Sequence, residues 1–183
     1  MKNFLRLCLV GVKVKMINLN STSKFSGSIT IPSDKSISHR SAILNSIAYG
    51  KAEINNYSNG EDCLSTLNVL KNLGVDIKID NKEDFLNIKI TGNGFDGLSI
   101  PSSILDVGNS GTTTRLISGI LSTLNFDTTL SGDDSINSRP MKRIIEPLLK
   151  MGANISSDNN MAPLSFHPSI LKGIEFKMNV SSA

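Results

Sequence analysis

The chain has 183 residues, of which 39% are hydrophobic and 19% charged, with no tryptophan and two tyrosines. This composition is typical of a folded globular protein and excludes a disordered chain, and the length allows one large or two small domains. The net charge of +3 comes from four basic residues among the first fifteen, and the remainder holds 15 basic against 16 acidic residues. A nearly neutral body with few aromatic side chains argues against nucleic acid as a partner.

Residues 1–15 carry their four cations around a short apolar run and contain no acidic residue. The run is interrupted by Gly11, no small-residue cleavage signal follows it, and no stretch of about 18 apolar residues that would span a membrane occurs anywhere. We interpret residues 1–15 as an over-extended start or an appendage to the fold, with Met16 as a second start. A targeting segment and a genuine first strand remain alternatives.

The first half of the chain alternates between the periodicities of strands and helices from about residue 24 onward. The order is strand, helix, helix and hairpin, at 28–32, 36–49, 61–73, and 75–80 with 85–91. Gly50 and Gly74 follow the two helices, as helix-ending glycines do, and polar residues 81–84 supply the hairpin turn. A glycine-rich bend at 92–97 closes this unit.

The second half repeats this order. We predict a helix at 112–124, a strand at 127–132, a polar loop at 133–138 and a helix that starts near Arg139. Pro140 suits the first turn of that last helix, whereas Pro147 is expected to kink or split it.

Two pairs of residues recur at nearly the same interval. Gly74 and Gly152 lie 78 residues apart, and Arg40 and Arg115 lie 75 residues apart. A single match between helix ends is common, but two matches at one offset predict an internal duplication.

The arginines of this repeat end two similar segments, Asp-Lys-Ser-Ile-Ser-His-Arg at 34–40 and Asn-Ser-Gly-Thr-Thr-Thr-Arg at 109–115. Each places small polar residues at a predicted helix start, where free backbone N–H groups attract anions, and an arginine about one turn further. Two such segments predict ligands that carry several phosphates or carboxylates. For each segment alone, a plain helix cap with solvated charges is the alternative.

Other polar residues have a structural interpretation beside the functional one. His39 lacks a nearby cysteine or a serine–acid pair, so an ordinary surface or helix-packing histidine is favoured over a catalytic one. Asp133 and Asp134 are more typical of turn formers than of acid/base groups. Cys8 and Cys63 are the only cysteines and no metal-ligand spacing occurs, so the sequence predicts no disulfide, no zinc site and a cytoplasmic location.

Four segments together resemble the 5-enolpyruvylshikimate-3-phosphate synthase family. They are residues 32–40, 59–62, 106–115 and 139–143, in the family's order, and the resemblance runs from about Met16 to the last residue. It implies an α/β fold, an inside-out barrel of two domains built from repeated βαβαββ units. About two units of one substrate-binding domain would be present, at 34–100 and 104–180 within residues 34–183, after leading strands in 16–33.

The resemblance also implies a reaction, the transfer of an enolpyruvyl group from phosphoenolpyruvate to the 5-hydroxyl of shikimate 3-phosphate without metal or organic cofactor. It implies that Lys35 touches both substrates. The groups that hold shikimate 3-phosphate would be Ser36, Arg40 and Ser182, and those that line the phosphoenolpyruvate site Gly111 and Arg139. Asn109 and Arg115 would shape the site, and the full-length enzyme would be a monomer without membrane contact.

The chain departs from the family pattern in two places. Ser33 stands where many members have glycine, and the chain stops at Ala183, one residue after the serine that matches the start of a Ser-Ala-Gln or Ser-Ser-Gln segment. The second domain, which supplies the family's acid/base carboxylates, would be absent, so we expect the 183 residues alone to be inactive. A non-catalytic phosphate-binding remnant, a UDP-N-acetylglucosamine enolpyruvyl transferase and an RNA-processing relative are the alternatives, of which the last two are disfavoured.

Overall fold

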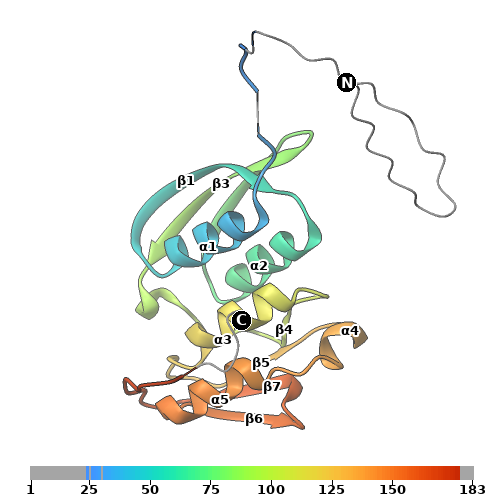
Figure 1. Cartoon of the computed structure of the whole chain (residues 1–183). Coiled ribbons are helices and arrows are strands. Elements are labelled where there is room, and N and C mark those ends of the chain that lie inside the picture. Colours follow the sequence, from blue (N-terminus) through green and yellow to red (C-terminus); the bar gives the residue numbers. More distant parts are fainter. Residues whose placement is uncertain (1–23, 25, 30, 178–183) are drawn as a thin grey trace, which may run out of the picture. The chain divides into compact units, whose positions relative to one another are not determined.

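The computed structural model describes residues 24, 26–29 and 31–177, and the chain divides into residues 1–31 and residues 32–183. All helices and strands of the described residues lie in the second part (Figure 1). In chain order they are α1 (Lys35–Ser46), β1 (Tyr49–Ser58), α2 (Glu61–Asn72), β2 (Asp76–Asn81), β3 (Phe85–Asn93), the 3₁₀ turn η1 (Phe95–Gly97), β4 (Leu105–Asp106), α3 (Gly111–Leu121), β5 (Thr128–Ser131), α4 (Asp134–Asn137), α5 (Lys142–Met151), β6 (Asn154–Asp158) and β7 (Met161–His167).

The strands form two sheets, with the orders β1-β3-β2 and β4-β5-β7-β6. All neighbours are antiparallel except β4 and β5, which are parallel. Helices α1, α2 and α3 lie between the two sheets (Figure 1). Helices therefore occupy the inside and sheets the outside, as the α/β fold expected from the sequence requires.

The two sheets have the same internal order, since β1-β3-β2 in the first corresponds to β5-β7-β6 in the second. In the first half a helix precedes β1 and a second helix precedes the β2–β3 hairpin, and in the second half α3 precedes β5 and α5 precedes the β6–β7 hairpin. Gly74 and Gly152 occupy equivalent places before the two hairpins, and both have the left-handed backbone that favours glycine, with φ of 89° and 100°. This correspondence supports the predicted duplication.

Apolar side chains from both halves pack into one core. Leu67 and Leu70 of α2, Ile88 of β3, Ile117 of α3 and Phe166 of β7 are almost fully buried within it. The helix and hairpin predictions for α2, β2 and β3 are confirmed, because their apolar residues follow the periods of the elements that they form. None of the helices in the described part of the chain is long and apolar enough to cross a membrane.

The prediction for the first helix is wrong at its end and on its buried face. The helix stops at Ser46 rather than Tyr49, because Tyr49 begins β1, a strand that the sequence did not predict. Gly50 lies inside that strand. Ile37 and Leu44 are 69% and 61% exposed. The buried face is formed by Ile43 together with the small or polar residues Ser38, His39, Ala42 and Ser46.

Three further predictions need correction. The described residues of the strand expected at 28–32 are not in a sheet, and Ile29 and Ile31 are exposed rather than packed against one. The loop expected at 133–138 contains α4, because the Asp133 carboxylate accepts the N–H of Ile136 and caps a helical turn. Helix α5 begins at Lys142 instead of Arg139, and Pro147 does not split it.

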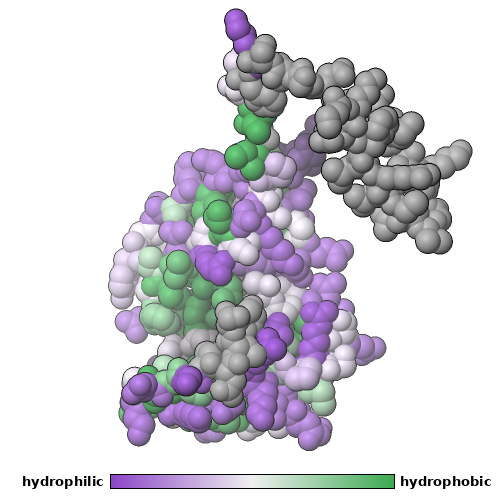
Figure 2. Space-filling view, viewed as in Figure 1, coloured by the Kyte–Doolittle hydropathy of each residue, from purple (hydrophilic) through white to green (hydrophobic). Residues whose placement is uncertain are grey.

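Apolar surface gathers on one face between α1 and the helices beneath it, whereas most of the remaining surface in that view is polar (Figure 2).

Candidate functional site

The two sequence segments with anion-binding character form helix starts, as predicted. At α1 the Asp34 carboxylate accepts the N–H of Ile37 at 2.7 Å, so Asp34 is the cap and Ser36 lies free of that role in the first turn. At α3 the Ser110 hydroxyl accepts the N–H of Thr113 at 3.2 Å. Lys35 and Gly111 are therefore the first residues of their helices, beside N–H groups that the helix leaves unpaired.

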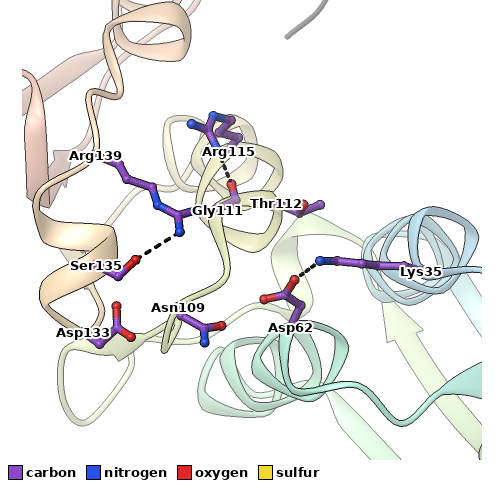
Figure 3. A pocket seen from close by; sticks show the side chains of 9 residues that line it. All are labelled: Lys35, Asp62, Asn109, Gly111, Thr112, Arg115, Asp133, Ser135 and Arg139. Atoms are coloured by element: carbon purple, nitrogen blue, oxygen red, sulfur yellow. Dashed lines mark hydrogen bonds and ion pairs between the residues drawn. The ribbon is translucent and has the colours of Figure 1, made fainter. Parts of the chain in front are cut away.

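A cavity of about 410 Å³ opens where the N-terminal ends of α1, α2 and α3 meet the loop before α5 (Figure 3). Polar and charged side chains dominate its lining. The lining residues are Lys35, Asp62, Asn109, Gly111, Thr112, Arg115, Asp133, Ser135 and Arg139.

On one side of the cavity the ammonium of Lys35 forms an ion pair with the carboxylate of Asp62 in the first turn of α2. The Lys35 side chain is about half exposed, and that of Asp62 is 22% exposed. The pair holds the lysine across the gap between two helices, with its ammonium facing the cavity (Figure 3). An incoming anion therefore meets a cation whose position is already restricted.

On the other side two guanidinium groups converge on Gly111. A methyl group on Gly111 would lie 2.6 Å from Nη1 of Arg115 and 3.4 Å from Nη1 of Arg139. Arg115 donates to the carbonyl of Gly111 at 3.1 Å, and Arg139 donates to the Ser135 hydroxyl at 3.0 Å. Neither arginine has a carboxylate among these bonds, so both keep donors for an anion.

Arg115 is repelled by the positive charges of Arg139, which lines the cavity, and of Arg143 nearby. Burial lowers the pKa of Arg115 below its usual value, and the neighbouring charges of Arg139 and Arg143 lower it further. Three cations that repel one another create a positive potential that a phosphate or carboxylate would relieve.

Five of the site residues predicted from the sequence line this cavity: Lys35, Asn109, Gly111, Arg115 and Arg139. Ser36 and Arg40 do not line it. Their side chains are exposed on α1, where Arg40 donates to the carbonyl of Ser36 at 3.2 Å. Ser182 lies outside the described residues.

Four cavity residues were not among the predicted site residues: Asp62, Thr112, Asp133 and Ser135. Asp62 lies in one of the four family-like segments, and an acidic residue in the first turn of a helix usually needs no further explanation. Ser135 gave no signal, because its place depends on the turn α4 that positions it against Arg139. Asp133 lines the cavity and caps α4, as its interpretation as a turn former anticipated.

His39 packs inside the protein, so of the two structural alternatives predicted for it the packing histidine is confirmed and the surface histidine is wrong. Its ring is fully buried, and Nδ1 lies 2.6 Å from the hydroxyl of Thr66 on α2. The pKa of His39 is lowered to about 4, mainly by burial and further by the charges of Lys35 and Arg40. The ring is therefore neutral near pH 7.

A second cavity of about 310 Å³ adjoins the same Lys35–Asp62 pair and reaches Cys63. Burial raises the pKa of the Cys63 thiol, so the thiol is a weak nucleophile. Cys63 is reduced, and Cys8 lies outside the described residues.

Residues 19–183 match the family described as EPSP synthase (3-phosphoshikimate 1-carboxyvinyltransferase). A 3-phosphoshikimate 1-carboxyvinyltransferase of Thermoanaerobacter sp. (strain X514) is 52% identical over 158 residues, covering 86% of this chain and 36% of that protein. The corresponding protein of Alkaliphilus metalliredigens (strain QYMF) is 47% identical over 92% of this chain and 39% of its own length.

Among solved structures, EPSP synthase from Acinetobacter baumannii superposes with a TM-score of 0.79 at 41% sequence identity. The match covers 86% of this chain and 35% of that chain. This chain thus spans a little over a third of the length of the relatives that it matches.

Proposed function

Because the chain belongs to the EPSP synthase (3-phosphoshikimate 1-carboxyvinyltransferase) family, we propose that it serves the transfer of an enolpyruvyl group from phosphoenolpyruvate to shikimate 3-phosphate. In this reaction the 5-hydroxyl oxygen of shikimate 3-phosphate adds to C2 of phosphoenolpyruvate, whose methylene carbon takes a proton. The tetrahedral adduct then loses phosphate and a proton to give the enol ether. Both substrates are multiply charged anions.

The observation that carries this proposal is the convergence of Lys35, Arg115 and Arg139 on one cavity. Phosphoenolpyruvate has a phosphate and a carboxylate close together, which suits two guanidinium groups that meet at Gly111. Lys35 then faces both substrates from the opposite wall. Asn109 shapes the cavity between them.

Shikimate 3-phosphate is proposed to extend from Lys35 along the exposed start of α1, where Ser36 and Arg40 project. Among the described residues, Arg40 donates to a backbone carbonyl of its own helix, so its guanidinium is able to turn toward a phosphate. Ser182 would add a further hydroxyl. A positively charged set of groups of this kind acts by positioning the substrates and by stabilising charge in the transition state.

The first test is calorimetric titration of the chain with each substrate. Arg40→Ala is expected to weaken shikimate 3-phosphate binding by about tenfold or more, because it removes a charged hydrogen bond worth ~1.5–3 kcal/mol. Arg139→Ala is expected to weaken phosphoenolpyruvate binding to a similar extent.

Lys82→Ala is the matched control, since it also removes one cation, but one paired with Asp80 beside the hairpin turn. It should leave both affinities unchanged. Equal binding by the wild-type, Arg40→Ala and Arg139→Ala chains would exclude the proposed site. Binding of phosphate alone, without preference for either substrate, would favour a non-catalytic phosphate-binding remnant.

We also propose, on the family resemblance, that the full-length enzyme is a cytoplasmic monomer that needs no metal or organic cofactor. Sedimentation of the full-length enzyme would test the oligomeric state, and its turnover with and without a chelator would test the need for metal.

A further inference from the structure

Four buried polar side chains form a continuous chain beneath the cavity. The contacts are His39 Nδ1 to Thr66 Oγ1 at 2.6 Å, Thr66 Oγ1 to Thr113 Oγ1 at 2.7 Å, and Thr113 Oγ1 to Ser110 Oγ at 2.7 Å. All but His39 carry hydroxyls, and all four residues are essentially inaccessible to solvent. Because they come from α1, α2 and the start of α3, the chain joins three helices.

The direction of these hydrogen bonds follows from the backbone carbonyl of Asp62, which lies beside the chain and can only accept. Thr113 Oγ1 lies 3.2 Å from the backbone carbonyl of Asp62, so the Thr113 proton goes to that carbonyl. Thr113 must then accept from both Thr66 and Ser110. The Thr66 hydroxyl has one proton, which goes to Thr113 at 2.7 Å rather than to the same Asp62 carbonyl at 3.5 Å.

The direction fixes the state of the histidine. Since the Thr66 proton is used elsewhere, the Thr66 oxygen must accept from a proton on Nδ1 of His39. Nε2 then carries only a lone pair, which agrees with its being buried without a partner among the described residues. The opposite tautomer would bury an unpaired N–H, which is the costlier arrangement.

We propose that His39 is a positioning residue for the cavity: as the neutral Nδ1–H ring it heads a hydrogen-bond chain that holds Asp62 and the Ser110–Gly111 turn at one spacing. Asp62 is held on both sides, by Thr113 at its carbonyl and by Lys35 at its carboxylate. Ser110 caps the helix that begins with Gly111. The chain therefore sets the distance between the two walls seen in Figure 3.

Hydrogen bonds are suited to this task because they are directional, whereas apolar packing between helices permits small displacements. The buried face of α1 has Ile43 as its one large apolar side chain, so polar contacts such as this chain and the Lys35–Asp62 pair contribute much of what fixes α1 against α2. This inference rests on the proposed function. A constant distance between the two walls matters because the cavity is proposed to bind phosphorylated ligands.

The tautomer is tested on the full chain by long-range ¹H–¹⁵N NMR of the imidazole at neutral pH. The expected signature is a protonated Nδ1 and an unprotonated Nε2 on His39. A proton on Nε2, or a charged ring, would overturn the assignment whatever the chain binds.

The positioning role is tested with Thr66→Val, which keeps the shape of the side chain but removes its hydroxyl. The affinity for inorganic phosphate and for shikimate 3-phosphate is expected to fall about fivefold, the equivalent of one buried hydrogen bond, while circular dichroism shows a folded chain. Thr66→Ser should restore wild-type affinity. Unchanged affinity in a folded Thr66→Val chain would overturn the proposal.

Thr128→Val is the matched control, because Thr128 lies buried in β5 with a hydroxyl that has no partner among the described residues. The same substitution there should leave both affinities unchanged. A loss as large as that of Thr66→Val would mean that the effect comes from general destabilisation.

If Thr66→Val does not fold, His39→Asn and His39→Gln give the same information. The asparagine amide places a donor near the Nδ1 position and should keep the affinity, whereas glutamine places it near Nε2 and should lose it. Equal affinities of the two variants would overturn the proposal.

A wild-type chain that binds neither phosphate nor shikimate 3-phosphate would contradict the proposed function instead. The positioning role is then decided by the amide NMR signals of Asn109 and Gly111. We expect these signals to shift in Thr66→Val and to stay in place in Thr128→Val. Signals that stay in place in Thr66→Val, or that shift equally in both variants, would overturn the role.

Discussion

At the scale of single residues, Gly111 is decisive because it has no side chain. Its position lets Arg115 and Arg139 approach the same point from two elements, and Arg115 bonds to its carbonyl. Gly119 lies on the same helix, where a methyl group would meet nothing within 4 Å. Comparing alanine substitutions at the two glycines therefore distinguishes an effect on the cavity from an effect on the stability of the helix.

Gly111→Ala is expected to weaken phosphoenolpyruvate binding by about tenfold, or ~1.4 kcal/mol, because the new methyl group displaces the Arg115 guanidinium. Gly119→Ala should leave binding unchanged and raise the free energy of unfolding by about 1 kcal/mol, as alanine does in an exposed helix. Calorimetric titration and urea unfolding measure the two effects. The prediction fails if Gly111→Ala binds as tightly as Gly119→Ala.

His39 links the stability of the chain to pH. Its pKa in the folded chain is lowered to about 4 from the usual 6.5, chiefly by burial. The unfolded chain therefore binds more protons between these pH values. The contribution of His39 is complete above pH 6.5 and is lost as the pH falls toward 4, by about 3 kcal/mol at most.

Urea unfolding of the wild type and of His39→Asn across this pH range checks this link. The wild type is expected to lose more stability than the variant, since asparagine does not titrate. Carboxylates contribute equally to both chains, so parallel stability curves would show that the histidine is not responsible.

At the scale of elements, the two halves of the chain share a helix end that requires glycine. Gly74 and Gly152 both have positive φ, and a methyl group on Gly74 would also overlap the side chain of Ser99. A methyl group on Gly152 would lie 3.1 Å from the carbonyl oxygen of Ile170. Both sites thus combine a left-handed backbone with a close neighbour.

Gly74→Ala and Gly152→Ala are each expected to lower the free energy of unfolding by roughly 1–2 kcal/mol, the cost of a left-handed backbone for an L-residue. The loss should be larger at Gly74 because of the overlap with Ser99. Urea unfolding with Gly119→Ala as the reference gives the comparison. A stabilising effect at either position would contradict the equivalence of the two helix ends.

Local sequence predicted those elements whose apolar residues follow a clear period, such as α2 and the β2–β3 hairpin. Local sequence did not predict β1, because Gly50, Lys51 and two asparagines give this segment a low intrinsic strand propensity. Pairing of Ile54 with Ile88 on β3 provides what the local pattern lacks. Similarly, α4 exists because Asp133 caps it, a use of aspartate that looks like a turn in sequence.

At the scale of the whole molecule, this chain spans a little over a third of the length of its relatives, and the described residues bring Lys35, Arg115 and Arg139 to one cavity. Asp62, one of the two carboxylates of the main cavity, is paired with Lys35, and the other, Asp133, caps a helical turn. Neither is placed as a free general acid or base.

We therefore predict that the 183 residues alone bind substrate without turning it over. Expression of this chain in a strain that lacks EPSP synthase should not restore growth without aromatic amino acids, whereas a full-length relative should. Growth supported by these residues alone would refute the prediction. Release of phosphate from phosphoenolpyruvate, assayed in vitro, gives an independent measurement.

The sequence alone determined the family, the α/β class and five residues of the cavity, because each of these leaves a local signal of period, spacing or motif. The tertiary structure alone decided that Asp62 pairs with Lys35, that Ser135 orients Arg139, and that His39 heads a buried chain of hydroxyls. The Ser135–Arg139 contact spans four residues and depends on the helical turn α4. The Lys35–Asp62 and His39–Thr66 contacts join residues on different helices. Their existence depends on how helices pack, which no single segment of the chain encodes.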